Sequence, residues 1–385
     1  MGAPRCSRAR GAGEARVIQT KARLGDVVDF RYGQGLPASA RVEGPVPVFG
    51  SGGLVGRHSE ACVVGPVLVL ARKGSIGAIY WVPSNAYPID TTYWAAPGAE
   101  VDKRWLYYWL HTVDFRGLSS GSGVPSLRRD DLNDLEISLP PKRQQQKIAE
   151  VLGALDDKIA ANRRAAQTGR ELILAQWSRL VSDAEETREW STFVETNPKV
   201  PAVKDGTAPY LDMKNLPENG LLVEEWGERP PQGGARFQNG DTLFARITPC
   251  FENRKHGYVD FLDDGEVGYG STEYIVFRAR EGVSAAIPFV VTATADFRSF
   301  AAQHRTGTSG RQRVQAPDLV SYEAAWPGDL RAVEFGAFAE PLIARLGAAR
   351  DENRVLAKTR DELLPLLMSG KITVRDAEKR VEGVV

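Results

Sequence analysis

The chain has 385 residues, 42% hydrophobic and 25% charged, which is typical of a globular protein with two or three domains and excludes a disordered or fibrous chain. Basic and acidic residues are equal in number, so the net charge is zero, which argues against a non-specific nucleic-acid binder. Three scattered cysteines without CxxC spacing argue against a disulfide framework or zinc site and favour a reducing, cytoplasmic location.

The first half of the chain combines a mixed domain with a long helix. Residues 1–19 are rich in Arg, Gly and Ala but lack the apolar centre of a signal peptide, so we expect a flexible basic extension. No apolar run approaches the roughly 18–20 residues that cross a bilayer, so no membrane partner is expected. Residues 20–140 carry short β-branched and aromatic runs between Gly and Pro turns, which predicts an α/β domain.

A helix is expected within residues 141–183, after Pro140-Pro141, because apolar residues recur there at alternating spacings of three and four. This spacing is a heptad seam, typical of a helix that pairs with another. A helix of about 40 residues is roughly 60 Å long. The predicted seam positions of this helix are Leu152, Leu155, Ile159, Asn162 and Ile173.

The second half repeats this plan. Residues 184–327 predict a second α/β domain, residues 328–368 a second long helix, and residues 369–385 a short charged tail. The second seam has a charged interruption at Arg360, which we expect to face water or a partner subunit. Its other predicted positions are Leu342, Leu346, Asn353, Leu356, Leu363 and Leu367.

An internal repeat relates the two halves. Gly123–Leu132 is echoed by Gly310–Leu319, an offset of 187 residues (310 − 123), which is too long for a solenoid. Asn162 and Asn353 are 191 apart, which predicts four extra residues near the start of the second helix. The predicted fold is mixed α+β: two α/β domains joined by two long helices in an antiparallel coiled coil, with a pseudo-twofold repeat. The two asparagines either set the register of this pair or are solvated at its edge.

No catalytic or metal-binding set emerges. Ser369-Gly370-Lys371 lacks the preceding glycine and the strand-to-helix context of a P-loop, and no two histidines have metal-ligand spacing. We therefore expect a non-enzymatic chain with no cofactor of its own.

Glycine-rich loops with arginines recur in both halves and are the candidate binding elements. Glycine allows close approach of the backbone, hydroxyl and N–H groups hold phosphates, and arginine can read a guanine edge. The alternative is that each is an ordinary solvated turn. The candidate DNA-binding residues are Ser51, Arg57, Arg72, Lys73, Ser75, Ser122, Arg246, Thr248, Asn253, Arg254, Lys255, Thr308, Ser309, Arg311 and Arg313.

Taken together, these motifs resemble the specificity (S) subunits of type I restriction-modification systems. The ordered set occurs in two copies and covers about residues 20–370. The motifs are Arg72–Gly77 (RKGSIG), Gly121–Leu127 (GSGVPSL), Leu139–Ile148 (LPPKRQQQKI), Leu152–Asp156 (LGALD), Leu243–Asn253 (LFARITPCFEN) and Gly307–Arg313 (GTSGRQR).

The resemblance implies two target-recognition domains, 20–140 and 184–327, each reading one half of a bipartite site in double-stranded DNA. It implies that the helices set the gap between the half-sites and that two methyltransferase (modification) subunits dock on them. S-adenosylmethionine, ATP and Mg would belong to those subunits and to a restriction/translocase subunit. Two alternatives remain: a specificity subunit of a fused restriction–methylation enzyme or other phage-defence complex, and a coiled-coil scaffold that binds proteins and not DNA.

Overall fold

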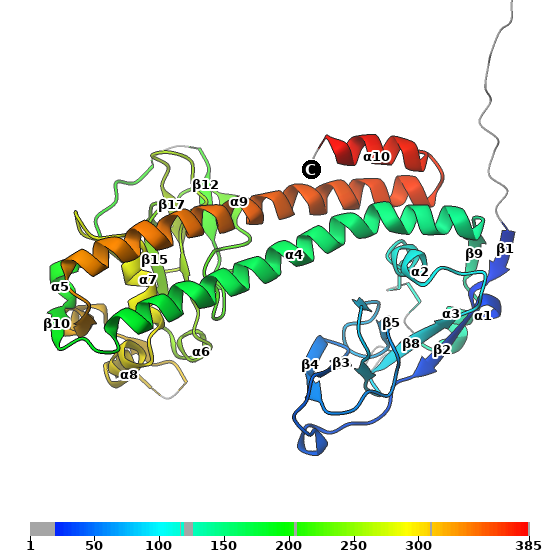
Figure 1. The fold of residues 1–385 in the computed structure, drawn as a ribbon, viewed down its shortest axis with the longest axis horizontal. Helices are drawn as coiled ribbons and strands as arrows, with labels where there is room; N and C mark the ends of the chain where they lie inside the picture. Colours follow the sequence, from blue (N-terminus) through cyan, green and yellow to red (C-terminus); the bar gives the residue numbers. More distant parts are fainter. Residues whose placement is uncertain (1–19, 116, 119–125, 204–205, 309, 384–385) are drawn as a thin grey trace, which may run out of the picture. The chain divides into compact units, whose positions relative to one another are not determined.

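A computed structural model describes residues 20–115, 117–118, 126–203, 206–308 and 310–383 (Figure 1). Two compact units divide the described chain. The first unit contains the residues up to Asp157 together with those from Ala357 onward, and the second unit is Lys158–Leu356. Both boundaries fall inside the two long helices, so each unit holds part of both. The predicted extension at 1–19 lies outside the described residues, and the domain boundaries at 140, 183 and 327 stay predictions.

The first unit is built on an antiparallel four-stranded sheet in the order β2-β8-β5-β6. Its strand β5 is central and fully buried, which explains the unbroken apolar run VLVLA. The four strands are β2 (Val28–Tyr32), β5 (Val67–Ala71), β6 (Ile79–Val82) and β8 (Thr92–Pro97).

Smaller elements complete the first unit. A second sheet has the order β4-β3-β7, and β1 pairs with β9 where the globular part leads into the long helix (Figure 1). The Asp102 side chain caps the N-terminus of α2 by accepting from the Trp105 amide at 2.8 Å. These elements are β1 (Thr20–Arg23), α1 (Leu24–Val27), η1 (Ala38–Ala40), β3 (Val46–Gly50), β4 (Gly53–His58), β7 (Tyr87–Pro88), α2 (Lys103–Leu110), α3 (Arg129–Asn133) and β9 (Glu136–Leu139).

The second unit repeats the main sheet in the order β11-β18-β15-β16, again antiparallel. Its central strand β15 is fully buried, as β5 is, and helix α7 packs against β15, β16 and β18. The main elements are β11 (Val194–Thr196), β15 (Thr242–Ala245), β16 (His256–Tyr258), β18 (Tyr274–Ala279), α7 (Ala286–Ala293) and α8 (Ala295–Gln303).

The remaining elements of the second unit differ most from the first. Its second sheet has four strands in the order β13-β12-β17-β14, whereas the first unit has three. These elements are β10 (Glu186–Glu189), α5 (Trp190–Phe193), β12 (Ala208–Leu211), β13 (Gly227–Arg229), β14 (Ala235–Phe237), α6 (Thr248–Glu252), β17 (Gly268–Gly270), β19 (Arg305–Thr306), β20 (Arg313–Val314), η2 (Ala316–Ser321) and β21 (Glu323–Trp326).

Corresponding backbone contacts relate the two units as copies of one plan. The pair β10–β21 matches β1–β9, and an isolated bridge joins Lys73 to Ser126 in the first unit and Ile247 to Arg313 in the second. Ser126 and Arg313 are separated by the repeat offset of 187 (313 − 126). The duplication seen in the sequence therefore extends to sheet order and to individual bridges.

The two long helices are α4 (Lys142–Val181) and α9 (Asp329–Met368), each of 40 residues. Their starts and their ends differ by the same 187 residues (329 − 142 and 368 − 181). The prediction of four extra residues near the start of the second helix is therefore wrong. Asn162 and Asn353 are therefore not equivalent positions of the repeat. With the offset of 187, Asn162 corresponds to Ala349, which lies about one helical turn before Asn353 in α9. A short helix, α10 (Val374–Glu382), follows.

Within the second unit, α4 and α9 run side by side in opposite directions (Figure 1). The Trp177 and Phe335 rings are 5.0 Å apart at one end, and at the other Asn162 donates to the Asn353 amide oxygen at 2.9 Å. Asn162 also donates to Glu352 at 2.6 Å. The register role of Asn162 stays a prediction, but its amide has polar partners on α9.

The predicted seam positions differ in burial. Leu342 and Asn353 are half-buried, and their neighbourhood instead buries Ile343 and Arg350, while Trp177 is a buried residue absent from the predicted seam. In the first unit, Arg360 of α9 donates to Asp156 of α4 at 2.6 Å, so it faces the neighbouring helix and not water or a partner subunit alone. The buried members of the predicted seam are Leu152, Leu155, Ile159, Asn162, Ile173, Leu346, Leu356, Leu363 and Leu367.

Candidate nucleic-acid interface

In the first unit, the candidate residue Arg72 directly follows the buried strand β5. Its guanidinium lies over the rings of Tyr32 and Tyr93, 5.0 and 5.6 Å from their centroids, and Nη1 donates to the Asp90 carbonyl at 2.8 Å. Its own carbonyl accepts from the Leu127 amide at 2.9 Å. Arg72 therefore packs on two tyrosines and ties the end of β5 to the chain before α3.

Two loops of the first unit meet beside Arg72. Lys73 and Ser75 are exposed on the turn after β5, which Gly74 permits with a φ of +69°. A Cβ on Gly74 would lie 3.4 Å from the Ser51 hydroxyl, so the β3–β4 turn is its neighbour. Arg57 is exposed on β4 and donates to the Pro45 carbonyl at 2.8 Å. Exposed hydroxyl and ammonium groups thus gather on Gly-containing turns.

In the second unit, Arg246 occupies the position after β15 that Arg72 occupies after β5. Arg246 donates to Glu273 at 3.1 Å, and Arg313 donates to both oxygens of the same carboxylate at 2.8–2.9 Å. Hydrogen bonds from Arg313 hold the pKa of Glu273 below its ordinary value, and Arg246 adds to this effect. One carboxylate therefore orients two of the candidate arginines and partly neutralises them.

The remaining candidates of the second unit divide into exposed and buried groups. Arg254, Thr308 and Arg311 are exposed, as is Asn253, which donates to Glu218 at 3.2 Å. Lys255 is only 9% exposed.

Two predicted contacts have other partners. Lys255 Nζ donates to the carbonyls of Met213, Lys214 and Leu216 at 3.1–3.2 Å. Thr248 is buried and donates to the Gln312 carbonyl at 2.8 Å. Both side chains brace loops of the fold, because their donors are already used inside it. Ser122 and Ser309 lie outside the described residues.

Three residues of this surface were absent from the sequence prediction. Tyr32 is 50% exposed and carries Arg72, while the Arg129 guanidinium lies 5.7 Å from its ring centroid. Glu273 joins Arg246 to Arg313. An aromatic residue at the end of a predicted strand was a usable signal for Tyr32, but nothing local marked Glu273, whose partners are 27 and 40 residues away.

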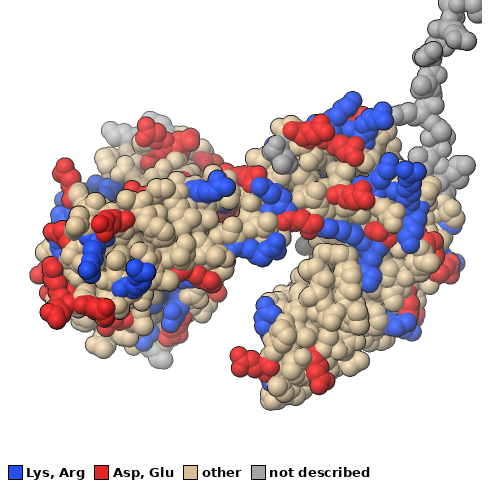
Figure 2. Space-filling view, viewed as in Figure 1, with Lys and Arg blue, Asp and Glu red and all other residues tan. Residues whose placement is uncertain are grey.

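Figure 2 shows basic and acidic residues interspersed on the face in view of each unit. The face in view is therefore not wholly basic in either unit. Over the described parts of the chain, no three His, Cys, Asp or Glu side chains are grouped as metal ligands, and no helix is long and apolar enough to span a membrane.

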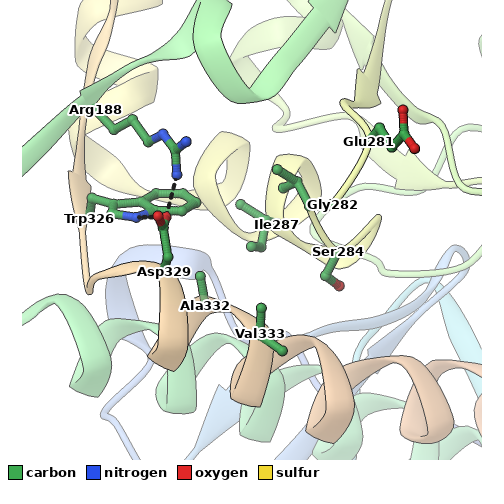
Figure 3. A pocket seen from close by; sticks show the side chains of 10 residues that line it. Arg188, Glu281, Gly282, Ser284, Ile287, Trp326, Asp329, Ala332 and Val333 are labelled. Atoms are coloured by element: carbon green, nitrogen blue, oxygen red, sulfur yellow. Dashed lines mark hydrogen bonds and ion pairs between the residues drawn. The ribbon is translucent and has the colours of Figure 1, made fainter.

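A pocket of about 260 Å³ lies in the second unit beside the first turns of α9. Figure 3 shows Arg188 over the Trp326 ring, with its guanidinium directed at Asp329. Arg188 and the Trp326 indole N–H both donate to Asp329, at 2.6 and 3.1 Å. The polar groups at this end of the pocket thus satisfy one another and join β10 and β21 to α9.

Known proteins similar to this chain come from the systems that the loop motifs indicated. Residues 19–167 match the family model described as the type I restriction modification DNA specificity domain. The specificity subunit of the type I restriction enzyme MjaIX from Methanocaldococcus jannaschii is 23% identical over 316 residues, 73% of this chain and 71% of that protein. The specificity subunit of the Escherichia coli enzyme EcoAI is 29% identical over 136 residues, 33% of this chain and 23% of that protein.

The alignment with the EcoAI subunit thus spans less than a quarter of that protein's length. The crystal structure of the S subunit of a type I restriction-modification system from M. genitalium shares the fold, with a TM-score of 0.62 and 14% identity over 92% of this chain and 97% of that one. The family model, the named relatives and the shared fold agree with the resemblance inferred from the loop motifs. Over residues 19–167 the chain matches the DNA specificity domain of type I restriction-modification systems, and over most of its length it is similar to a specificity subunit of such a system.

Proposed function

We propose that this chain gives a type I restriction-modification complex its DNA sequence specificity, with each of its two β-rich regions reading one half of a bipartite site. The observation that supports this most is the repetition of one plan at matching places. In both units a buried central strand ends at an arginine, Arg72 or Arg246, whose carbonyl accepts from the chain before the next helix or turn. Two similar but non-identical surfaces suit two different half-sites.

The contacts to DNA are divided by chemistry. In the second unit, Glu273 holds Arg246 and Arg313 in fixed orientations, which favours reading of guanine edges over loose phosphate contact. In the first unit, Lys73, Ser75 and Ser51 lie on adjoining turns and contact phosphates or base edges. The proposed set is completed by Arg57, Arg72, Asn253, Arg254, Thr308 and Arg311. Thr248 and Lys255 are left out because their donors are engaged within the fold.

The two long helices would hold the two DNA-reading regions apart. We infer that α4 and α9 form one antiparallel coiled coil that sets the gap between the half-sites, supported by the opposed runs of buried residues within each unit. Two methyltransferase subunits dock on these helices, and a restriction/translocase subunit joins them, in the cytoplasm. S-adenosylmethionine, ATP and Mg act in those partners.

Binding measurements on the full chain, co-expressed with the modification subunits of its own system, test the assignment. The recognised site is first identified as the bipartite adenine-methylation motif that disappears from the source genome when this gene is deleted. Arg246→Ala should then weaken binding and relax preference at one half-site only, at about 1–3 kcal/mol for a lost guanine contact. Arg57→Ala, which removes an exposed arginine of the other unit, should weaken binding at the other half-site only. Unchanged affinity and preference in both variants would refute the reading role.

Salt dependence separates DNA reading from protein scaffolding, because each phosphate contact releases counterions. The logarithm of the binding constant should fall linearly as the logarithm of salt rises. Adding one heptad to both α4 and α9 lengthens the pair by about 10 Å. It should widen the preferred gap between half-sites, and a gap that stays constant would contradict the spacer role. A fused restriction–methylation enzyme as partner would give the same DNA results but co-purify as a single longer polypeptide.

A further inference from the structure

Arg298 of α8 is a buried cation whose neighbours are not acids. It is 8% exposed, and its Nη2 donates to His256 Nδ1 at 2.8 Å while Nη1 donates to the Phe251 carbonyl at 3.4 Å. Its guanidinium also lies over the rings of Phe244 and Phe251, 5.2 and 5.9 Å from their centroids. Among the described residues no carboxylate forms an ion pair with Arg298. The charge is therefore held by neutral groups alone.

Two more arginines gather around this buried charge. Burial first, and then the nearby charges of Arg254 and Arg170, lower the pKa of Arg298 to about 10. The pKa of His256 lies well below its ordinary value, through complete burial first and then through Arg298, Arg170 and Arg254. Arg254 is exposed beyond α6, and Arg170 is a half-buried residue of α4. Arg254 and Arg298 also share an acceptor, because the Phe251 carbonyl accepts from the Arg254 amide at 3.0 Å and from Arg298 Nη1 at 3.4 Å.

The acids in the neighbourhood leave this excess in place. Glu171 acts on Arg170 and is bonded to Gln167 along α4, and Glu252 is paired with Arg305 at 3.1 Å. Neither forms an ion pair with Arg298 or Arg254.

Such an arrangement is costly without an anion. An unpaired guanidinium taken out of water loses several kcal/mol of solvation, and two further like charges add repulsion. Buried polar atoms also stay without partners among the described residues: His256 Nε2, Arg298 Nε and Arg170 Nε. A guanidinium fork binds two oxygens of a phosphate in parallel, and the negative charge of the phosphate would offset part of the repulsion among the three arginines.

We propose that Arg170, Arg254 and Arg298 form a phosphate site that holds a backbone phosphodiester of the bound DNA duplex. The proposal rests on the proposed function and adds a contact that positions the duplex without reading its sequence. Arg254 is the exposed member that meets the phosphate first, and Arg298 supplies a desolvated charge behind it. Because Arg170 belongs to α4, the site links the DNA backbone directly to a long helix and not only to the recognition loops.

The test compares two double variants of the full chain with its modification subunits. Arg170→Gln with Arg254→Gln removes two charges from the site and keeps the buried Arg298, which protects the fold. Arg163→Gln with Arg164→Gln removes two exposed charges from α4 and is the matched control. Affinity is measured over a range of KCl for a duplex with the recognised site and for an unrelated duplex.

The site variant should lose roughly tenfold in affinity for both duplexes and reduce the salt slope by about 1–2, with the preference between duplexes unchanged. The control should keep the wild-type values. A salt slope and affinity equal to those of the wild type would overturn the phosphate site, and so would an equal loss in the control. Wild-type protein that fails to prefer its own site would instead refute the proposed function, so the two failures are distinguishable.

Neutral methylphosphonate substitution identifies the phosphate. Replacing one backbone phosphate at a time should reveal a position that weakens wild-type binding and has no effect on the site variant. The absence of any such position would overturn the proposal. A second experiment measures the melting temperature with inorganic phosphate added. If phosphate raises the melting temperature of the wild type but not that of the site variant, and the two proteins bind DNA with the same affinity, then the site binds a free anion and the DNA assignment is wrong.

Discussion

Replacing Lys255 tests whether a lysine in a basic, exposed-looking segment supports the fold or contacts DNA. Its ammonium donates to three backbone carbonyls, of Met213, Lys214 and Leu216, and the residue is 9% exposed. A hydrogen bond to a charged group contributes about 1.5 kcal/mol net, and three would give ~4–5 kcal/mol. Because burying the ammonium opposes this gain, we expect Lys255→Met to lower the free energy of unfolding by about 3 kcal/mol.

The measurement is urea unfolding of the full chain followed by circular dichroism and tryptophan fluorescence. With a urea m-value of about 3 kcal/mol per M for a unit of this size, the midpoint should fall by roughly 1 M. Arg254→Met is the matched control, because the adjacent Arg254 is exposed and its loss should change stability by less than ~0.5 kcal/mol. An unchanged midpoint in Lys255→Met, accompanied by a loss of DNA affinity like that of Arg254→Met, would refute the reasoning and return Lys255 to the DNA contacts.

The remaining predictions concern Glu273, the helix pair and Asp156. The folded-state pKa of Glu273 lies below its ordinary 4.5, so the ionised carboxylate stabilises the fold fully above pH 4.5, and this stabilisation is lost as pH falls through the folded pKa. Glu273→Gln should therefore flatten the dependence of the urea midpoint on pH below 4.5. A dependence as steep as that of the wild type would contradict the assignment. Gly169→Ala would place a Cβ 2.7 Å from Leu346 Cδ1 and should cost about 1–3 kcal/mol by thermal unfolding, whereas Thr168→Ala on the exposed face should cost almost nothing. Asp156→Ala removes the carboxylate that accepts from both Arg360 and the Tyr108 hydroxyl. It should lower the melting temperature more than Asp157→Ala, because the Asp157 carboxylate is more exposed. Equal effects of the two variants would argue against a stabilising role of the Asp156 hydrogen bonds.

Much of the fold follows from periodicity that is visible along the chain. Both 40-residue helices, the buried runs at β5 and β15, and the offset of 187 all depend on the spacing of apolar residues and on turn residues, which are local properties. The equivalence of Arg72 and Arg246 could likewise be predicted, because each follows a strand of the same pattern. The predicted four-residue insertion was wrong because a shift of four residues carries each d position of one heptad onto the next a position, so much of the apolar match survives a misalignment of one turn.

The sequence by itself therefore determined the duplicated plan, the helix lengths and the resemblance to type I restriction-modification specificity subunits. Only the tertiary structure decided which cations are available: Lys255 is enclosed by carbonyls about 40 residues away, Arg246 and Arg313 share Glu273, and Arg298 is buried without an acid. The physical reason is that a cation's role depends on the desolvation and partners it meets after folding, and these come from distant segments. In the chain all these arginines and lysines look alike; in the fold they divide into braces, oriented readers and a candidate phosphate site.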